Sequence, residues 1–236
     1  MLILGIDTAD PRGSVALRRD GLELTAALHE ASEDYSSWVL PAAQRVCREA
    51  GYSVKDPDVF AVSTGPGSFT GLRVGLTTVK AWAEVYQKQV VGVSRLEAMA
   101  SFAGDGSGYV AAFYDARRGH IFGGLYRWNS RLEAVEPAAV IAPSEFLARV
   151  SEIAGSARVS WISLDPELVT QLDPWKRRSS SGDTMSASPL NLAKGIAELA
   201  EQRAKRGEFT AVLSLDANYV RRSDAEMMWK DSAADG

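Results

Sequence analysis

A glycine-rich turn that joins an apolar run to a helical segment constrains this chain more than any other stretch. The run at residues 59–62 is apolar and β-prone, and the segment at 72–86 has apolar residues at helical spacing. Between them, Gly65, Gly67 and Gly71 allow backbone groups to approach a ligand or a second segment without interference from a side chain. Strand, turn and helix in this order predict one unit of an α/β fold.

This turn has two functional interpretations. A helix that begins directly after a glycine-rich turn offers N–H groups and the positive end of its dipole to an anion. The sequence does not match the common nucleotide motifs, because Gly71 is not followed by a Lys-Ser/Thr pair and Thr70 stands where a dinucleotide-binding fingerprint requires glycine. A tight strand–helix connection is one alternative. The other is a degenerate nucleotide site formed by Asp7, Gly65, Gly67, Ser68 and Gly71.

The helix predicted at residues 72–86 is apolar on two faces. Its bulkier stripe should pack on its own sheet, and it contains Leu72, Leu76, Val79, Ala83 and Tyr86. The second face carries small and β-branched residues, which suit the close approach of another helix, either within the chain or from a partner. The helix predicted at 36–50 also has an apolar arc wider than one sheet contact requires. We therefore expect a partner-binding surface that contains Trp38, Ala42, Val74, Thr78, Ala81 and Val85.

The same order of elements occurs twice in the chain. Residues 2–18 read as a strand, a terminal Asp7, a polar turn with glycine and a returning strand. Residues 109–128 repeat this unit, with Asp115 at the end of the first strand. The repetition indicates an internal duplication.

A run of glycine and polar residues at 104–108 marks the boundary between the two units. We expect a first lobe at 1–103 that binds the partner and a second lobe at 109–236, whose last part is free to pack back on the first. The Ser-rich stretch at 176–188 reads as a loop, followed by a helix that starts at Ser188-Pro189. Two lobes that each open with a meander and continue in alternating helices and strands predict a two-lobed actin-like ATPase (ASKHA) fold with duplicated mixed sheets.

Each predicted lobe places an acid at the end of its first strand, Asp7 and Asp115. In active members of an actin-like fold, acids at this place hold a metal–phosphate unit. Strand-end aspartates also cap their own turns, and the sequence favours that role for both. The alternative function is an actin-fold, kinase-like phosphotransferase, in which Asp7 positions Mg²⁺ and the turn from Gly65 to Gly71 holds phosphate.

The residue inventory argues against several kinds of chemistry. The two histidines, His29 and His120, are far apart and form no HExxH or HxxxH pattern, so we expect neither a metal site nor a catalytic residue. The single cysteine, Cys47, lies on an apolar helical stripe, which is typical of a buried thiol and fits a reducing cytoplasm. The net charge of -4 argues against tRNA binding by this chain alone. No apolar run approaches the roughly 18 residues of a membrane helix.

The motif GPGSFTGLRVGL at residues 65–76, together with ILGIDTA at 3–9, resembles the bacterial TsaB (YeaZ) family. That family takes part in the biosynthesis of threonylcarbamoyladenosine (t6A) in tRNA. Weaker matches continue with YDARRGHIF at 114–122 and NYVRR at 218–222. The resemblance implies the same actin-like fold and a pairing surface on helices of the first lobe.

The resemblance also implies a function and partners. The chain would be a non-catalytic scaffold subunit of the bacterial t6A modification complex, pairing with the catalytic paralogue TsaD. A TsaE-like ATPase and, through the complex, tRNA are the further partners, and the chain alone is either a homodimer or a monomer. The catalytic relative holds its metal with a histidine pair on the first helix, whereas the matching residues 34–38 contain no histidine. We expect no tightly bound cofactor, with ATP and Mg²⁺ entering through the partner complex.

Overall fold

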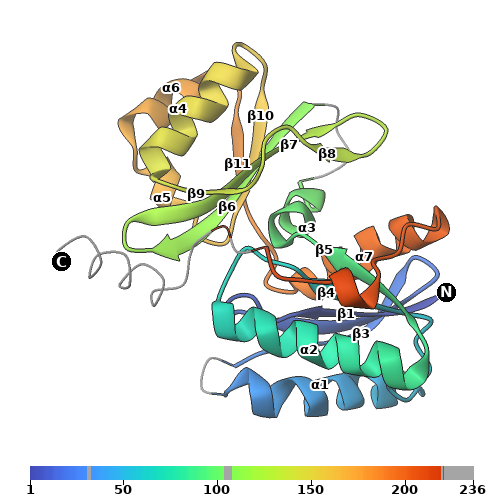
Figure 1. Cartoon of the computed structure of the whole chain (residues 1–236). Coiled ribbons are helices and arrows are strands. Elements are labelled where there is room, and N and C mark those ends of the chain that lie inside the picture. The colour runs from blue at the N-terminus through green and yellow to red at the C-terminus, as the bar shows by residue number, and fades with distance from the viewer. Residues whose placement is uncertain (31–32, 104–107, 219, 221–236) are drawn as a thin grey trace, which may run out of the picture.

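The first lobe is built on a sheet of strands β1 (Leu2–Asp7), β2 (Ser14–Arg19), β3 (Leu22–Leu28), β4 (Val59–Ser63) and β5 (Gln89–Val93). The computed structural model describes residues 1–30, 33–103, 108–218 and 220. The strand order is β3-β2-β1-β4-β5 (Figure 1). β1 is antiparallel to β2 and parallel to β4, which places it in the middle of the sheet.

The second lobe repeats this arrangement with strands β6 (Gly108–Arg117), β7 (His120–Trp128), β8 (Leu132–Ala134), β9 (Ala139–Ile141), β10 (Val159–Ser163) and β11 (Thr184–Ala187). Its order is β11-β10-β6-β7-β8, and β9 also pairs with β7. β6 is antiparallel to β7 and parallel to β10, as β1 is to β2 and β4. The prediction of two duplicated lobes with mixed sheets is confirmed.

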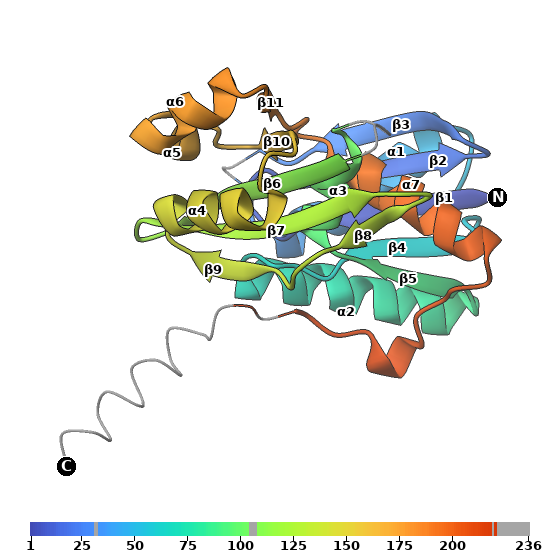
Figure 2. The ribbon, with the colours of Figure 1, turned by 90° about the horizontal axis from the view of Figure 1, so that it is seen from above.

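The helices are α1 (Tyr35–Glu49), α2 (Phe69–Tyr86), α3 (Arg95–Ser101), α4 (Pro143–Ala154), α5 (Glu167–Thr170), α6 (Asp173–Ser180) and α7 (Leu192–Lys205), with a short 3₁₀ turn, η1 (Val212–Ser214). α1 and α2 cover one face of the first sheet, and α7 covers the other (Figure 2). α3 lies between the lobes, where it contacts α7, β6 and β7. None of the described helices is long and apolar enough to cross a membrane.

The continuous apolar sequence of β1 reflects burial on both faces. Leu4 and Ile6 belong to the core beneath α1 and α2, whereas Ile3 packs in the core beneath α7 with Ile196 and Ala197. A strand covered on both sides loses the alternation of polar and apolar residues that a half-exposed strand shows. The two covering layers fix the end of β1, and therefore Asp7, at the junction of the lobes.

Several predicted boundaries differ from the structure. The stretch 176–188, predicted as a loop, contains most of α6 and all of β11, because β11 gains a parallel partner in β10 and Arg178 pairs with Asp183 at 2.9 Å. The helix predicted to start at 188 begins instead at Leu192. It is capped by Asn191, whose side chain accepts a hydrogen bond from the Lys194 N–H at 3.3 Å. Residues 104–107 of the predicted linker lie outside the described residues, as do 219, 221 and 222 of the NYVRR motif and the rest of the tail.

Candidate functional site

The carboxylate of Asp7 is fully buried and is held by two groups of the protein. Arg95, the first residue of α3 and also fully buried, donates from Nε to Asp7 Oδ2 at 2.9 Å. The N–H of Ala9 donates to Oδ1 at 3.1 Å, which is the capping role of a strand-end aspartate. Burial by itself lowers the pKa of Arg95, but the charge of Asp7, followed by Tyr114 and Asp10, raises it by more, so this guanidinium stays charged.

Asp10 and Arg12 continue this site across the junction of the lobes. Arg12 Nε donates to Asp10 Oδ1 at 2.7 Å, and Arg12 also bonds Asp165, which follows β10 in the second lobe. Asp165 in turn accepts the N–H of Asp115 at 2.9 Å. We call Asp7, Asp10, Arg12, Arg95 and Asp165 the interlobe ion cluster. Burial raises the pKa of Asp10, but hydrogen bonds from Arg12 and the charge of Arg95 outweigh it, and the pKa lies below its ordinary value.

Tyr114 of β6 closes the cluster from the second lobe. The Arg95 guanidinium carbon lies 4.4 Å from the centre of its ring, a cation–π contact. Its hydroxyl donates to the Pro66 carbonyl at 2.5 Å, so the second lobe rests directly on the glycine-rich turn. The carboxylate of Asp115 pairs within its own hairpin, where Arg117 Nη1 lies 3.2 Å from Asp115 Oδ2. Among the described residues, no hydrogen bond or ion pair joins the Asp115 carboxylate to the Asp7 carboxylate.

The glycines of the turn serve a close contact between two loops. A Cβ at Gly67 would lie 2.2 Å from the Ala9 carbonyl oxygen, and one at Gly71 would lie 2.0 Å from the Thr8 carbonyl oxygen. The Thr8 hydroxyl donates to the Gly71 carbonyl at 2.7 Å. Gly65 adopts a φ of 100°, which favours glycine. The geometry agrees with the tight connection, because these backbones approach each other and leave no room for side chains between them.

Ser68 is used within the same contact. Its N–H donates to the Ala9 carbonyl at 2.6 Å, and its hydroxyl caps α2 by accepting the Gly71 N–H at 3.3 Å. A phosphate at this helix end would have to compete with both bonds. Asp7 and the glycine turn lie close together, as a nucleotide site would require, but Asp7 is held by Arg95 and Ala9, and the turn is held by Thr8 and Ala9.

The start of α1 carries aromatic residues in place of a metal-binding pair. The Tyr35 hydroxyl donates to the Asp10 carbonyl, and the His29 ring stacks on Tyr35 with centroids 4.1 Å apart. The His29 nitrogens lie 2.8 Å from the carbonyl oxygens of Pro11 and Glu33. In the part of the chain that the structure describes, no three histidine, cysteine, aspartate or glutamate side chains are grouped as metal ligands.

The exposed face of α2 carries part of the predicted partner surface. Val85 is 71% exposed, Ala81 is exposed and Thr78 is partly buried, whereas Val74 is partly buried and packs against the core of the first lobe itself. On the opposite face, Leu72, Leu76, Val79 and Ala83 are buried and Tyr86 packs against the same core, as the sequence predicts.

Trp38 and Ala42 do not belong to this surface. They are only 7% and 3% exposed and lie in the core of the first lobe. The apolar arc of α1 is wide because α1 packs on both the sheet and α2.

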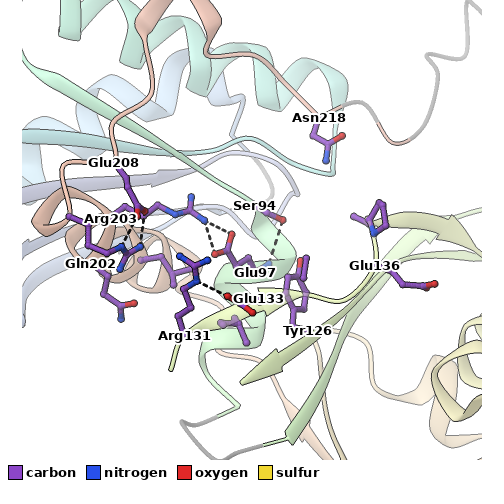
Figure 3. A pocket seen from close by; sticks show the side chains of 16 residues that line it. Ser94, Glu97, Tyr126, Arg131, Glu133, Glu136, Gln202, Arg203, Glu208 and Asn218 are labelled. Atoms are coloured by element: carbon purple, nitrogen blue, oxygen red, sulfur yellow. Dashed lines mark hydrogen bonds and ion pairs between the residues drawn. The ribbon is translucent and has the colours of Figure 1, made fainter. Parts of the chain in front are cut away.

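A separate pocket of about 590 Å³ opens between the lobes on the side of α3 and α7 (Figure 3). Its wall carries arginine–glutamate pairs: Arg203 Nη2 lies 2.7 Å from both carboxylate oxygens of Glu97, and Arg131 Nε lies 2.7 Å from Glu133 Oε1. Arg206 bonds Glu208 in the same way at 2.8 Å. These arginines are already paired, so the wall offers little net attraction to a phosphate.

Sequence reasoning missed Arg12, Arg95, Tyr114 and Asp165. Arg95 alone carried a usable signal. A cation at a helix N-terminus opposes the helix dipole, so an arginine directly after the Ser94 cap needs an acidic partner elsewhere. Arg12 lies in an ordinary turn, Tyr114 in an apolar strand and Asp165 just after the end of a strand, and none of these places indicates a site.

The sequence profile of the family described as "TsaD: tRNA N6-adenosine threonylcarbamoyltransferase" matches residues 29–212. The tRNA threonylcarbamoyladenosine biosynthesis protein TsaB of Bacillus subtilis (strain 168) is 28% identical over 235 residues, covering 98% of this chain and 99% of the relative. The Escherichia coli (strain K12) protein of the same name is 29% identical over 237 residues, covering 98% and 97%. A solved structure, of an uncharacterized protein with similarity to peptidase YeaZ from Pseudomonas aeruginosa, matches with a TM-score of 0.75 at 26% identity, covering 93% of this chain and 99% of that one. The resemblance to the TsaB (YeaZ) family is confirmed.

Proposed function

Because this chain belongs to the family described as TsaD: tRNA N6-adenosine threonylcarbamoyltransferase, we propose that it is a non-catalytic subunit of the machinery that makes t6A in tRNA. Two relatives that match it nearly end to end are named TsaB, for tRNA threonylcarbamoyladenosine biosynthesis. The observation that carries the non-catalytic role is the buried ion pair between Arg95 and Asp7. An aspartate already neutralised by an arginine of its own chain is poorly placed to hold a metal–phosphate unit.

The principal partner is a TsaD-like catalytic paralogue, which docks on the exposed face of α2. Val85 and Ala81 supply the apolar contact, and the partly buried Val74 and Thr78 let the partner helix approach closely. The same face forms a homodimer when the paralogue is absent. A TsaE-like ATPase and tRNA join through the complex, which also supplies the ATP and Mg²⁺. The complex acts in the cytoplasm.

Reconstitution tests this proposal. The chain is co-purified with the TsaD-like protein of the same organism, and the t6A content of an unmodified tRNA transcript is measured by mass spectrometry after incubation with the complete set of proteins. We expect a stable complex and a loss of t6A formation when this chain alone is left out. Full t6A formation without the chain contradicts the proposal. The kinase-like alternative is not favoured, and ATP turnover by the isolated chain that requires Asp7 would revive it.

A further inference from the structure

We propose that the Arg95 guanidinium is a built-in cation that joins the two lobes, in the place between Asp7, Asp10 and Tyr114 where a free divalent cation would otherwise neutralise the acids. Arg95 Nε lies 2.9 Å from Asp7 Oδ2, and Arg95 Nη2 lies 3.7 Å from Asp10 Oδ1. Both carboxylates come from the first lobe, whereas the ring stacked on the guanidinium comes from the second.

The bonding of Arg95 is incomplete in a way that fits this role. Its Nη1 and Nη2 are buried and have no hydrogen-bond partner among the described residues. An arginine selected only for hydrogen bonding in a core would have these donors satisfied, because unsatisfied buried donors are costly. Within the described part of the chain, the Arg95 side chain makes one hydrogen bond, from Nε to Asp7, and its other interactions are with the charge of Asp10 at 3.7 Å and with the ring of Tyr114. The position therefore demands positive charge more than it demands a particular set of donors.

The two acids have the chemistry that a hard divalent cation prefers, since Mg²⁺ and Ca²⁺ bind carboxylate oxygens. The residues present do not fit such an ion together with Arg95, because a second positive charge beside a fully buried guanidinium would be strongly repelled. The guanidinium also contacts the second lobe, since its carbon lies 4.4 Å from the centre of the Tyr114 ring. A divalent cation would link the lobes only while it is bound, whereas Arg95 is a permanent part of the chain.

Removing the guanidinium tests the proposal in the isolated chain, independently of any partner. The variants are Arg95→Ala, Arg95→Ala/Asp7→Asn and Arg95→Lys, and the measurements are thermal melts and calorimetric titrations with Ca²⁺ and with Mg²⁺. Loss of one partner of a buried ion pair should lower the Tm of Arg95→Ala by roughly 10 °C. We expect either cation to restore much of that loss with a saturable midpoint. The wild type and Arg95→Lys, which keep a charge at the site, should not respond.

The double variant identifies the site of the cation. Arg95→Ala/Asp7→Asn should be insensitive to both ions, because one of the two carboxylates has been neutralised. Equal stabilisation of the single and double variants overturns the proposal, as does a response of the wild type. Failure of Arg95→Ala to fold even with Ca²⁺ present also overturns it, because a free cation must be able to replace the guanidinium.

Discussion

Arg12, in the loop after β1, forms a two-point ion pair with Asp165, after β10 of the other lobe: Nη1 lies 2.7 Å from Oδ1 and Nη2 lies 3.1 Å from Oδ2. The same guanidinium bonds Asp10 through Nε, so one planar group links two carboxylates. Bidentate geometry and partial burial make such a pair stronger than the exposed ion pairs of a protein surface. The loops of the two lobes are therefore fastened to each other at this point.

Replacement of Arg12 should loosen this fastening. Arg12→Met leaves the carboxylates of Asp10 and Asp165 without their main partner, and we expect the free energy of unfolding to fall by about 1–3 kcal/mol. Arg117→Met is the matched control, because Arg117 pairs with Asp115 in an exposed hairpin turn and should change stability by less than about 0.5 kcal/mol. Urea unfolding measures both. Equal effects of the two substitutions would show that the interlobe pair contributes no more than a surface pair.

Val85→Glu distinguishes docking on α2 from a purely structural role of that face. Because Val85 is 71% exposed, the added carboxylate stays in water and the monomer should keep its Tm. Binding of the TsaD-like partner should be lost, since the interface would bury an unpaired charge. Size-exclusion chromatography with and without the partner, beside a thermal melt, gives both readouts. Val135→Glu, at an exposed valine of the second lobe, is the control and should leave the complex intact.

Gly71→Ala should destabilise the protein although it improves helix propensity. Alanine in a helix is favoured over glycine by about 1 kcal/mol. Here the new Cβ would lie 2.0 Å from the Thr8 carbonyl oxygen, a clash with backbone, and we expect a net loss of about 3 kcal/mol. Gly51→Ala has open space around it and only a left-handed φ of 80°, so it should cost about 1 kcal/mol. A smaller loss for Gly71→Ala than for Gly51→Ala, by urea unfolding, is incompatible with the close loop contact.

Acid should weaken the interlobe ion cluster through Asp10. The folded-state pKa of Asp10 lies below the ordinary value of 3.8, so its ionised form stabilises the fold fully above that pH. This contribution is lost as the pH falls from 3.8 through the lower folded-state pKa. Urea unfolding over a pH series should therefore show a smaller acid-induced loss of stability in Asp10→Asn than in the wild type. An identical pH profile for the two proteins contradicts this assignment.

Local patterns in the sequence predict the fold better than the site. The repeated unit of strand, aspartate, turn and strand was recognisable because it spans few residues, and it anticipates the equivalence of β1 and β6. The strand β11 escaped prediction because its pairing with β10 is not visible in its own polar composition. Arg12 and Asp165 are 153 positions apart, and nothing near either residue predicts that they meet. Periodicity places Trp38 and Ala42 on a partner surface because it cannot tell burial by a neighbouring helix from burial by another chain.

The packing of α7 on the first sheet sets the order in which the chain can finish folding. Ile3, Val59 and Val91 lie in one core with Ile196 and Ala200, so the first sheet gains its second covering layer only after residues 192–205 have been synthesised. Until then one face of the first sheet presents apolar side chains to the solvent. A fragment that stops before residue 192 retains that exposed face, and we expect it to aggregate or to require a chaperone. The first lobe is therefore built from two separate segments of the chain, and no single position in the sequence divides it from the second lobe.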